Sequence, residues 1–142
     1  MTRIDFYIVD DEDPASRLRL ALRLTDKAHR AGHRVFIQAE SEGEARELDR
    51  QLWCFRAASF LPHALIVDDP GEQVCIGWGQ EPRQHDELLI NLQPRVPPFV
   101  AHFARVAELV NGEAQRRSAL RESWRHYREQ GYALEQHRLR SV

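Results

Sequence analysis

The strongest constraint on the fold is the alternation of short apolar segments with longer amphipathic ones along the first half of the chain. Residues 3–9 are rich in β-branched and aromatic side chains and end in an acidic turn, a pattern typical of a strand followed by a loop. Asp13 and Pro14 then mark a helix start, because an N-cap Asp accepts an orphan amide and Pro at N1 presets φ. We expect this helix to run to Gly32 and a second strand to follow at residues 34–37.

The alternation continues through the rest of the chain. Ser41 and Glu44 fit a capping box that opens a helix through about Phe55. Beyond a long connection we expect strands at 74–78, 87–92 and 106–110, a short helix at 97–104 and a last helix at 112–130.

Strands separated by crossover helices predict a particular fold class. We expect a single α/β domain over residues 1–142, a Rossmann-like three-layer αβα sandwich with a mostly parallel sheet of about five strands. The pattern leaves the strand order open, and an antiparallel central strand at 74–78 would look the same in sequence.

The composition excludes several classes of protein. The chain has 142 residues, a net charge of −2 and 42% hydrophobic residues, which is typical of one globular domain. No uncharged run approaches the roughly 20 apolar residues of a membrane span, and Asp5 interrupts the region where a secretory signal would be apolar. We therefore expect no membrane segment and a cytoplasmic protein. Cys54 and Cys75 lack a Cys-x-x-Cys spacing and are expected to be two buried thiols.

Motifs that carry catalysis or bind a cofactor are missing from the sequence. The single lysine, Lys27, falls inside the expected first helix, which excludes a Walker A loop. Gly77 and Gly79 precede no helix, which argues against a dinucleotide fingerprint. The seven histidines show no metal-ligand spacing, and no Gly-x-Ser-x-Gly elbow occurs. We expect no catalytic residue, no cofactor and no metal.

Asp10 and Asp11 leave one enzymatic alternative open. Acid pairs at the carboxyl end of a first strand hold Mg²⁺ in receiver domains of similar size, so a receiver-like or nucleotide-binding α/β protein is the second hypothesis. Such domains also need a lysine late in the chain, and none follows position 27. We therefore favour solvated loop acids at these two positions.

The last expected helix carries its arginines on one side. At 100° per residue, four of them fall within an arc of about 80°, namely Arg117, Arg121, Arg125 and Arg128. Trp124 falls between this arc and the apolar side, which Leu120 and Tyr127 mark. Residues 113–142 hold seven arginines and four glutamates, which indicates an acidic partner. Two other interpretations stay open, arginine stems that only cover a helix flank and direct nucleic-acid binding, although the near-neutral net charge argues against the latter.

Three blocks of the sequence resemble the chi subunits of bacterial DNA polymerase III. They are WCFRAASFLPH at 53–63, LLINL at 88–92 and RESWRHYREQGY at 121–132. The likeness covers nearly the whole chain, including FYIVD at 6–10. It implies a non-enzymatic clamp-loader accessory subunit that binds the psi subunit on one side. On the other side it implies binding of the acidic C-terminal tail of single-stranded-DNA-binding protein, with little direct DNA binding.

The resemblance also implies where these partners bind. The family's tail pocket corresponds here to Trp53, Val110, Arg117, Arg121, Trp124, Arg125, Gly131 and Tyr132, and the helical spacing adds Arg128. Relatives have Tyr at the position of Trp124 and Lys at two of the arginine positions, so ring and charge are kept while both shapes change. The contact with psi is expected around Phe60, Leu61 and Pro62.

Overall fold

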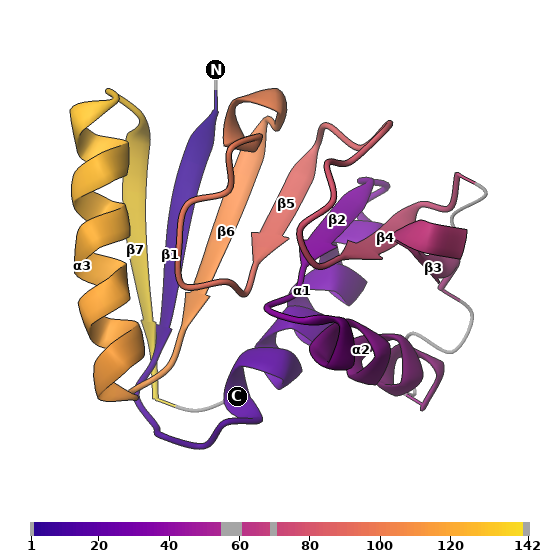
Figure 1. Cartoon of the computed structure of the whole chain (residues 1–142), viewed down its shortest axis with the longest axis horizontal. Coiled ribbons are helices and arrows are strands. Elements are labelled where there is room, and N and C mark those ends of the chain that lie inside the picture. Colours follow the sequence, from indigo (N-terminus) through magenta and orange to yellow (C-terminus); the bar gives the residue numbers. More distant parts are fainter. Residues whose placement is uncertain (1, 55–60, 69–70, 141–142) are drawn as a thin grey trace.

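The structure is a computed structural model and describes residues 2–54, 61–68 and 71–140 (Figure 1). The first half of the chain contains β1 (Arg3–Val9), α1 (Ser16–Arg30), β2 (Val35–Gln38), α2 (Glu42–Cys54), β3 (His63–Leu65) and the short 3-10 helix η2 (Ile66–Asp68). The second half contains β4 (Val74–Gly77), β5 (Leu88–Asn91), the 3-10 helix η3 (Val100–His102), β6 (Arg105–Val110), α3 (Ala114–Glu129) and β7 (Ala133–Leu139).

The strands form one sheet in the order β3-β4-β2-β5-β6-β1-β7, and each neighbouring pair is parallel. The predicted α/β class and parallel sheet are confirmed, but the sheet has seven strands instead of about five. The antiparallel alternative at 74–78 is wrong, because β4 runs parallel to both β2 and β3. The sequence did not reveal β3, which has three residues inside the predicted connection, or β7, whose side chains are mostly exposed.

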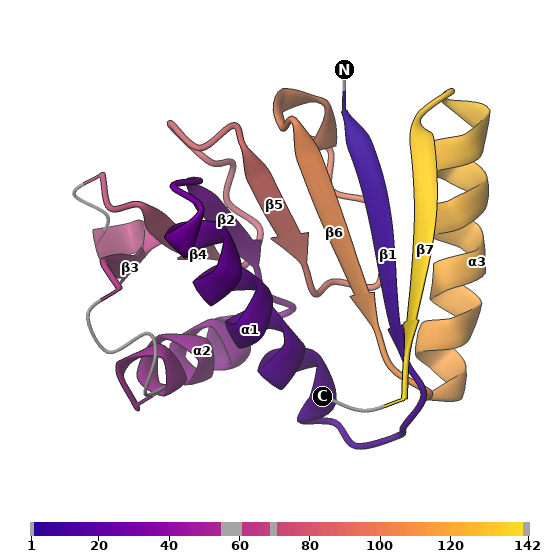
Figure 2. The same cartoon turned by 180° about the vertical axis from the view of Figure 1, so that it is seen from behind.

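Helices cover both faces of the sheet, as the αβα prediction requires. One apolar cluster joins α1 and α2 to the sheet, and a second joins α3 and the segment around η3 to the opposite face. Figure 1 shows α3 beside β7 and β1 at one edge, and Figure 2 shows α1 in front of the sheet when it is seen from behind. Alternate residues of β1 divide between the clusters, with Ile4 and Phe6 in the cluster of α3 and Val9 in that of α1.

The helix starts follow local hydrogen bonding. The prediction of an N-cap at Asp13 is wrong by two residues, because the N-cap is Ala15 and α1 begins at Ser16. Asp13 instead forms the preceding turn, where its Oδ1 accepts the Ala15 amide at 3.0 Å. The Ser41 N-cap is confirmed, because Ser41 Oγ accepts the Glu44 amide at 3.2 Å. The return bond of the capping box is shifted by one residue, since Glu44 Oε1 accepts the Glu40 amide at 2.9 Å.

Two later helices are shorter than the sequence indicates. The expected helix at 97–104 is reduced to the single turn η3, in a segment that follows two prolines without backbone N–H groups. The last helix begins at Ala114 and not at Gly112. Gly112 lies in the β6–α3 connection, at the point where this connection passes close to the backbone that follows β1. Its amide donates to the Asp11 carbonyl at 2.5 Å, and a Cβ on Gly112 would lie 2.7 Å from that oxygen.

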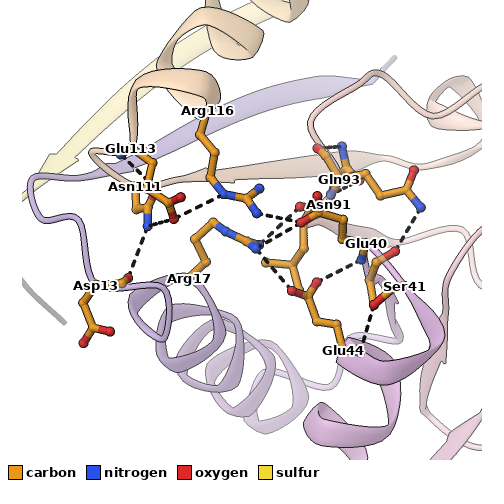
Figure 3. Close-up of polar contacts among 12 residues, drawn as sticks. Asp13, Arg17, Glu40, Ser41, Glu44, Asn91, Gln93, Asn111, Glu113 and Arg116 are labelled. Carbon is orange, nitrogen blue, oxygen red and sulfur yellow. Dashed lines mark hydrogen bonds and ion pairs between the residues drawn. The ribbon is translucent and has the colours of Figure 1, made fainter.

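A polar network ties the three helices together at the carboxyl edge of the sheet (Figure 3). Arg17 of α1 and Arg116 of α3 both reach Glu40, at 3.4 and 2.6 Å, and Arg17 also pairs with Glu44 at 3.2 Å. Asn111, which follows β6, donates to the backbone of the loop before α1. This network fixes the first turn of α3 relative to α1 and α2.

The two cysteines differ in burial, and the helices are limited in length and apolar character. Cys75 is buried in β4 as predicted, whereas Cys54 is exposed at the end of α2, so the expectation of two buried thiols is wrong for Cys54. Within the described ranges, no helix is both long and apolar enough to cross a membrane.

Candidate interaction surface

One side of α3 presents arginines to solvent while the other packs on the sheet. Tyr127 is fully buried and Ser123 is nearly so. Three of the four predicted arginines are exposed and Arg117 is half-buried. The predicted stripe is therefore brought together on one flank of the helix. We call Arg117, Arg121, Trp124, Arg125 and Arg128 the α3 arginine face.

The arginines of this face differ in their partners. Arg117 Nη2 lies 3.1 Å from Asp10 Oδ1, and Arg125 Nη1 lies 3.8 Å from Glu122 Oε1. Arg121 and Arg128 form no ion pair with any residue that the structure describes. Because exposed pairs contribute little free energy, the face holds two uncommitted guanidinium groups and two that are weakly held.

Trp124 is half-buried at the seam between the arginine face and the core. Its ring lies on Phe6 of β1, with 5.1 Å between ring centroids and 55° between planes. Phe6 also contacts Tyr127 at 5.9 Å. Trp124 thus packs on an aromatic cluster and remains half-buried between the arginines that flank it along α3.

The other predicted residues at this end of the sheet lie beside or beneath α3. Val110, at the end of β6, is 8% exposed and lies under the helix. Gly131 ends α3 with φ of +82°, and the next residue, Tyr132, places its ring edge-on to Tyr127 at 5.7 Å. Tyr132 also lines a groove of about 540 Å³ between α3 and the proline-rich segment 94–98. That groove lies on the flank of α3 opposite the arginines.

Trp53 is not brought together with these residues. It lies near the C-terminal end of α2, is 60% exposed and packs against His63 of β3 with 4.5 Å between ring centroids. Helices α2 and α3 belong to clusters on opposite sheet faces, and β3 and β7 are opposite edges of the sheet. Figure 1 shows α2 and α3 at opposite sides of the molecule. One small ligand group could not touch both tryptophans.

The residues expected to contact psi lie near Trp53. Leu61 is buried at 4% exposure, and Pro62 is exposed just before β3. Phe60 lies outside the residues that the structure describes. His63 holds this segment against α2, since its Nδ1 lies 2.9 Å from the Leu61 carbonyl and its Nε2 lies 3.3 Å from that of Asp49.

Asp10 and Asp11 are engaged with the protein itself. Asp10 pairs with Arg117 at 3.1 Å and with Arg138 at 3.2 Å. Asp11 Oδ1 accepts the amide of Asp13 at 3.1 Å, which shapes the turn before α1. Two guanidinium groups therefore already hold the carboxylate that a bound Mg²⁺ would need.

A group of possible metal ligands lies elsewhere, on the α1 side of β1 and β7. Within the described ranges, Asp5, Glu135 and His137 are the one cluster with the required spacing. Asp5 is fully buried and already paired with Arg3 at 3.2 Å and Arg105 at 2.6 Å. Burial raises the pKa of the Asp5 carboxyl, but hydrogen bonds from His137 and Arg105 outweigh it, so the pKa lies below its usual value. The cluster is an internal salt bridge, and its two guanidinium groups disfavour a cation.

Glu108 is a buried acid that the sequence analysis did not single out. Its Oε2 accepts the Tyr127 hydroxyl at 2.5 Å and its Oε1 accepts Asn91 Nδ2 at 2.8 Å. Burial raises the pKa of Glu108 to about 7, although both hydrogen bonds lower it. The signal in the sequence was a single charge inside the apolar run Val106–Val110, which a strand buried on both faces does not tolerate without a partner.

Comparison with known proteins identifies the family. The family model described as DNA polymerase III chi subunit, HolC, matches residues 1–135. The DNA polymerase III subunit chi of Pseudomonas aeruginosa is 48% identical over 139 residues, which cover 98% of both chains. Those of Escherichia coli and Haemophilus influenzae are 31% and 32% identical, over 94% and 91% of this chain and 96% and 92% of their own. The protein described above therefore belongs to the chi-subunit family of DNA polymerase III.

Proposed function

We propose that this protein is a non-enzymatic adaptor of the clamp loader that captures the acidic C-terminal tail of single-stranded-DNA-binding protein on the α3 arginine face. The observation that carries the proposal is the pair of uncommitted guanidinium groups, Arg121 and Arg128, beside the half-buried ring of Trp124. Membership of the chi family supports it, because the family resemblance implies this partner.

The chemistry of the tail fits this surface. We expect an acidic segment that ends in an aromatic residue with a free carboxylate. The planar fork of an arginine such as Arg121 can hold that carboxylate with two parallel hydrogen bonds, and Trp124 offers a ring for the terminal aromatic group. Each charge-assisted bond contributes roughly 1.5–3 kcal/mol before ordering costs, so micromolar affinity follows. Because the arginines are exposed, binding will weaken as salt rises.

The proposed contact places Trp53 outside the slot for the terminal ring of the tail. Five inter-strand steps of roughly 4.8 Å separate β3, beside Trp53, from β1, beneath Trp124, about 24 Å in all. The terminal ring of a tail bound beside Trp124 therefore lies beyond the reach of Trp53. Val110, Gly131 and Tyr132 support the site by holding the two ends of α3 against the sheet.

We place the psi contact on the other side of the molecule, around Phe60, Leu61 and Pro62. The support is that Pro62 is exposed and that Trp53, the most exposed large apolar side chain of the described residues, lies beside it on His63. Exposed aromatic groups of this kind are frequent anchors of protein interfaces. Through psi, the adaptor would be attached to the clamp loader while α3 stays free.

The tail site is tested by titrating the protein with a labelled acidic peptide that ends in Phe, followed by fluorescence anisotropy. We expect micromolar binding, and a loss of about tenfold or more in Arg121→Ala and in Trp124→Ala. Arg23→Ala, an exposed arginine of α1, is the matched control and should bind as the wild type does. Equal binding of a peptide with an amidated C-terminus would refute capture of the carboxylate.

The psi contact is tested by co-purification of tagged psi with chain variants. Pro62→Asp and Trp53→Ala should lower the recovered amount, because they place a charge on, or remove a ring from, the proposed contact. Arg121→Ala should leave recovery unchanged. If recovery falls only with Arg121→Ala, psi binds the side of α3 and the proposed psi contact is wrong.

A further inference from the structure

The Glu108 carboxyl lies directly behind the proposed binding face, on the inner side of α3. It is 4% exposed, and no ion pair among the described residues includes it. The groups that face it are Tyr127 and Arg116 from α3, Asn91 and Gln93 from the end of β5, and Phe6 from β1. Arg116 is committed to Glu40 and Glu113 at the carboxyl edge. An acid without a counter-ion is thus sealed between the sheet and α3.

The contacts of Glu108 accommodate both protonation states. The ionised carboxylate accepts one hydrogen bond from the Tyr127 hydroxyl and one from Asn91 Nδ2. When the acid is protonated, its own O–H donates to Tyr127 Oη at the same distance, because a phenol can accept as well as donate. Asn91 keeps its bond to the other oxygen. A proton can therefore be gained with the Glu108–Tyr127 contact kept, although the Tyr127 hydroxyl hydrogen then gives up the acceptor that it uses in the ionised state.

A short chain of aromatic contacts connects Glu108 to the arginine face. Tyr127 is one turn after Trp124 in α3, and the ring of Phe6 touches both. An anionic tail on the outer flank of α3 and an ionised Glu108 on its inner side would repel each other across a helix and an aromatic cluster that exclude water. Two charges about 11 Å apart, at an effective dielectric constant of about 20, change an affinity by about tenfold.

We propose that Glu108 is a positioning residue of the α3 arginine face, and that capture of an anionic tail there draws a proton onto its carboxyl. The inference rests on the proposed tail-binding function. Reciprocal linkage requires that protonation of Glu108 in turn tightens tail binding. Burial raises the pKa of this group to about 7, so the exchange falls in the physiological range. We expect binding to weaken by about tenfold as the pH rises from 6 to 8.5.

Calorimetry of the acidic Phe-terminated peptide at pH 7.5, in buffers of different ionisation enthalpy, measures the proton directly. The wild type should take up about half a proton per peptide. Glu108→Gln mimics the protonated acid, since its oxygen accepts from Asn91 and its amide donates to Tyr127. That variant should take up no proton at this site and should bind at pH 8.5 as tightly as the wild type binds at pH 6. Uptake by Glu108→Gln equal to that of the wild type would overturn the proposal.

Two further measurements keep the proposal separate from other effects. His126 is the exposed histidine of α3 and lies on the flank opposite the arginines. His126→Asn is the matched control and should retain the uptake that Glu108 supplies. If Glu108→Gln fails to fold, the infrared carbonyl band of a protonated carboxyl in the wild type should rise when the peptide is added, and its constancy would overturn the proposal. Absence of any peptide binding would refute the proposed function, whereas binding without proton uptake would refute this inference alone.

Discussion

At the scale of single residues, Asp5 and Glu108 show two ways of burying a carboxyl group. Asp5 is surrounded by Arg3, Arg105 and His137, which hold its pKa below the usual value in spite of burial. Glu108 has only neutral donors, Tyr127 and Asn91, and burial raises its pKa to about 7. The two groups therefore give the protein opposite responses to pH.

The stability contribution of Glu108 should be lost as the pH rises. In the unfolded chain its pKa is near 4.5 and in the folded chain it is about 7, so the folded state binds more protons between these values. The free energy of unfolding should fall by about 3 kcal/mol across this window in the wild type, relative to Glu108→Gln. Urea unfolding of both proteins at pH 4.5, 6 and 8 measures the difference. A constant difference at all three values would contradict a buried, titrating Glu108.

Asp5 should behave in the opposite way. Its ionised form is stabilised in the folded protein, and this stability is present above the unfolded pKa and lost as the pH falls through the lower folded value. Asp5→Asn leaves Arg105 and His137, both partly exposed to solvent, without their shared anion and should cost about 1–2 kcal/mol at pH 7. The cost should shrink in acid, which urea unfolding at pH 3 and pH 7 would show.

At the scale of elements, the success of sequence reasoning depended on whether a signal was local. The β1 strand, the N-cap at Ser41 and the end of the last helix near residue 130 depend on neighbouring residues and were predicted. The edge strand β7 was not predicted, because it contains no run of apolar residues. Its pairing with β1 joins segments that are far apart in the sequence. The same holds for the site: helical spacing placed the arginines, but the separation of Trp53 from α3 follows only from the strand order.

Two glycines should respond in opposite ways to alanine. Gly131 has φ of +82° with open space around a Cβ, so Gly131→Ala should cost about 1–2 kcal/mol through backbone strain alone. Gly43 lies inside α2 and has an ordinary contact at its Cβ position, so Gly43→Ala should stabilise the protein by about 0.5–1 kcal/mol. Thermal unfolding of both variants checks the two signs. Stabilisation by Gly131→Ala would mean that α3 does not end as described.

At the scale of the whole molecule, the network of Arg17, Arg116, Glu40 and Glu44 joins the three helices across both sheet faces. The side chain of Arg17 is 4% exposed, and its loss removes a cation from Glu44 and from Glu40, of which Glu40 keeps Arg116. The same loss removes the buried hydrogen bond that Arg17 donates to the Leu92 carbonyl at 3.2 Å. Arg17→Met should cost about 1.5–3 kcal/mol. Arg46→Met, which removes an exposed pair with Glu42, should change stability by less than about 0.5 kcal/mol. Equal costs for the two variants in urea unfolding would show that the network does not hold the helices together.

The whole-molecule charge gives a further prediction about DNA. The chain has a net charge of −2, and within the described residues two of its C-terminal arginines, Arg117 and Arg138, are paired with Asp10. Such a surface should not bind naked single-stranded oligonucleotide at moderate salt. A shift assay should show a complex only after single-stranded-DNA-binding protein is added. A stable complex with the naked oligonucleotide would instead favour a direct DNA binder.

The central claim is that the α3 arginine face captures an acidic tail with a free terminal carboxylate. It is tested most directly by nuclear magnetic resonance of the labelled protein during titration with the acidic Phe-terminated peptide. The claim predicts that the indole N–H of Trp124 and the amides of residues 117–132 shift as peptide is added, while the indole N–H of Trp53 stays in place. Shifts of the Trp53 indole with an unchanged Trp124 would contradict it.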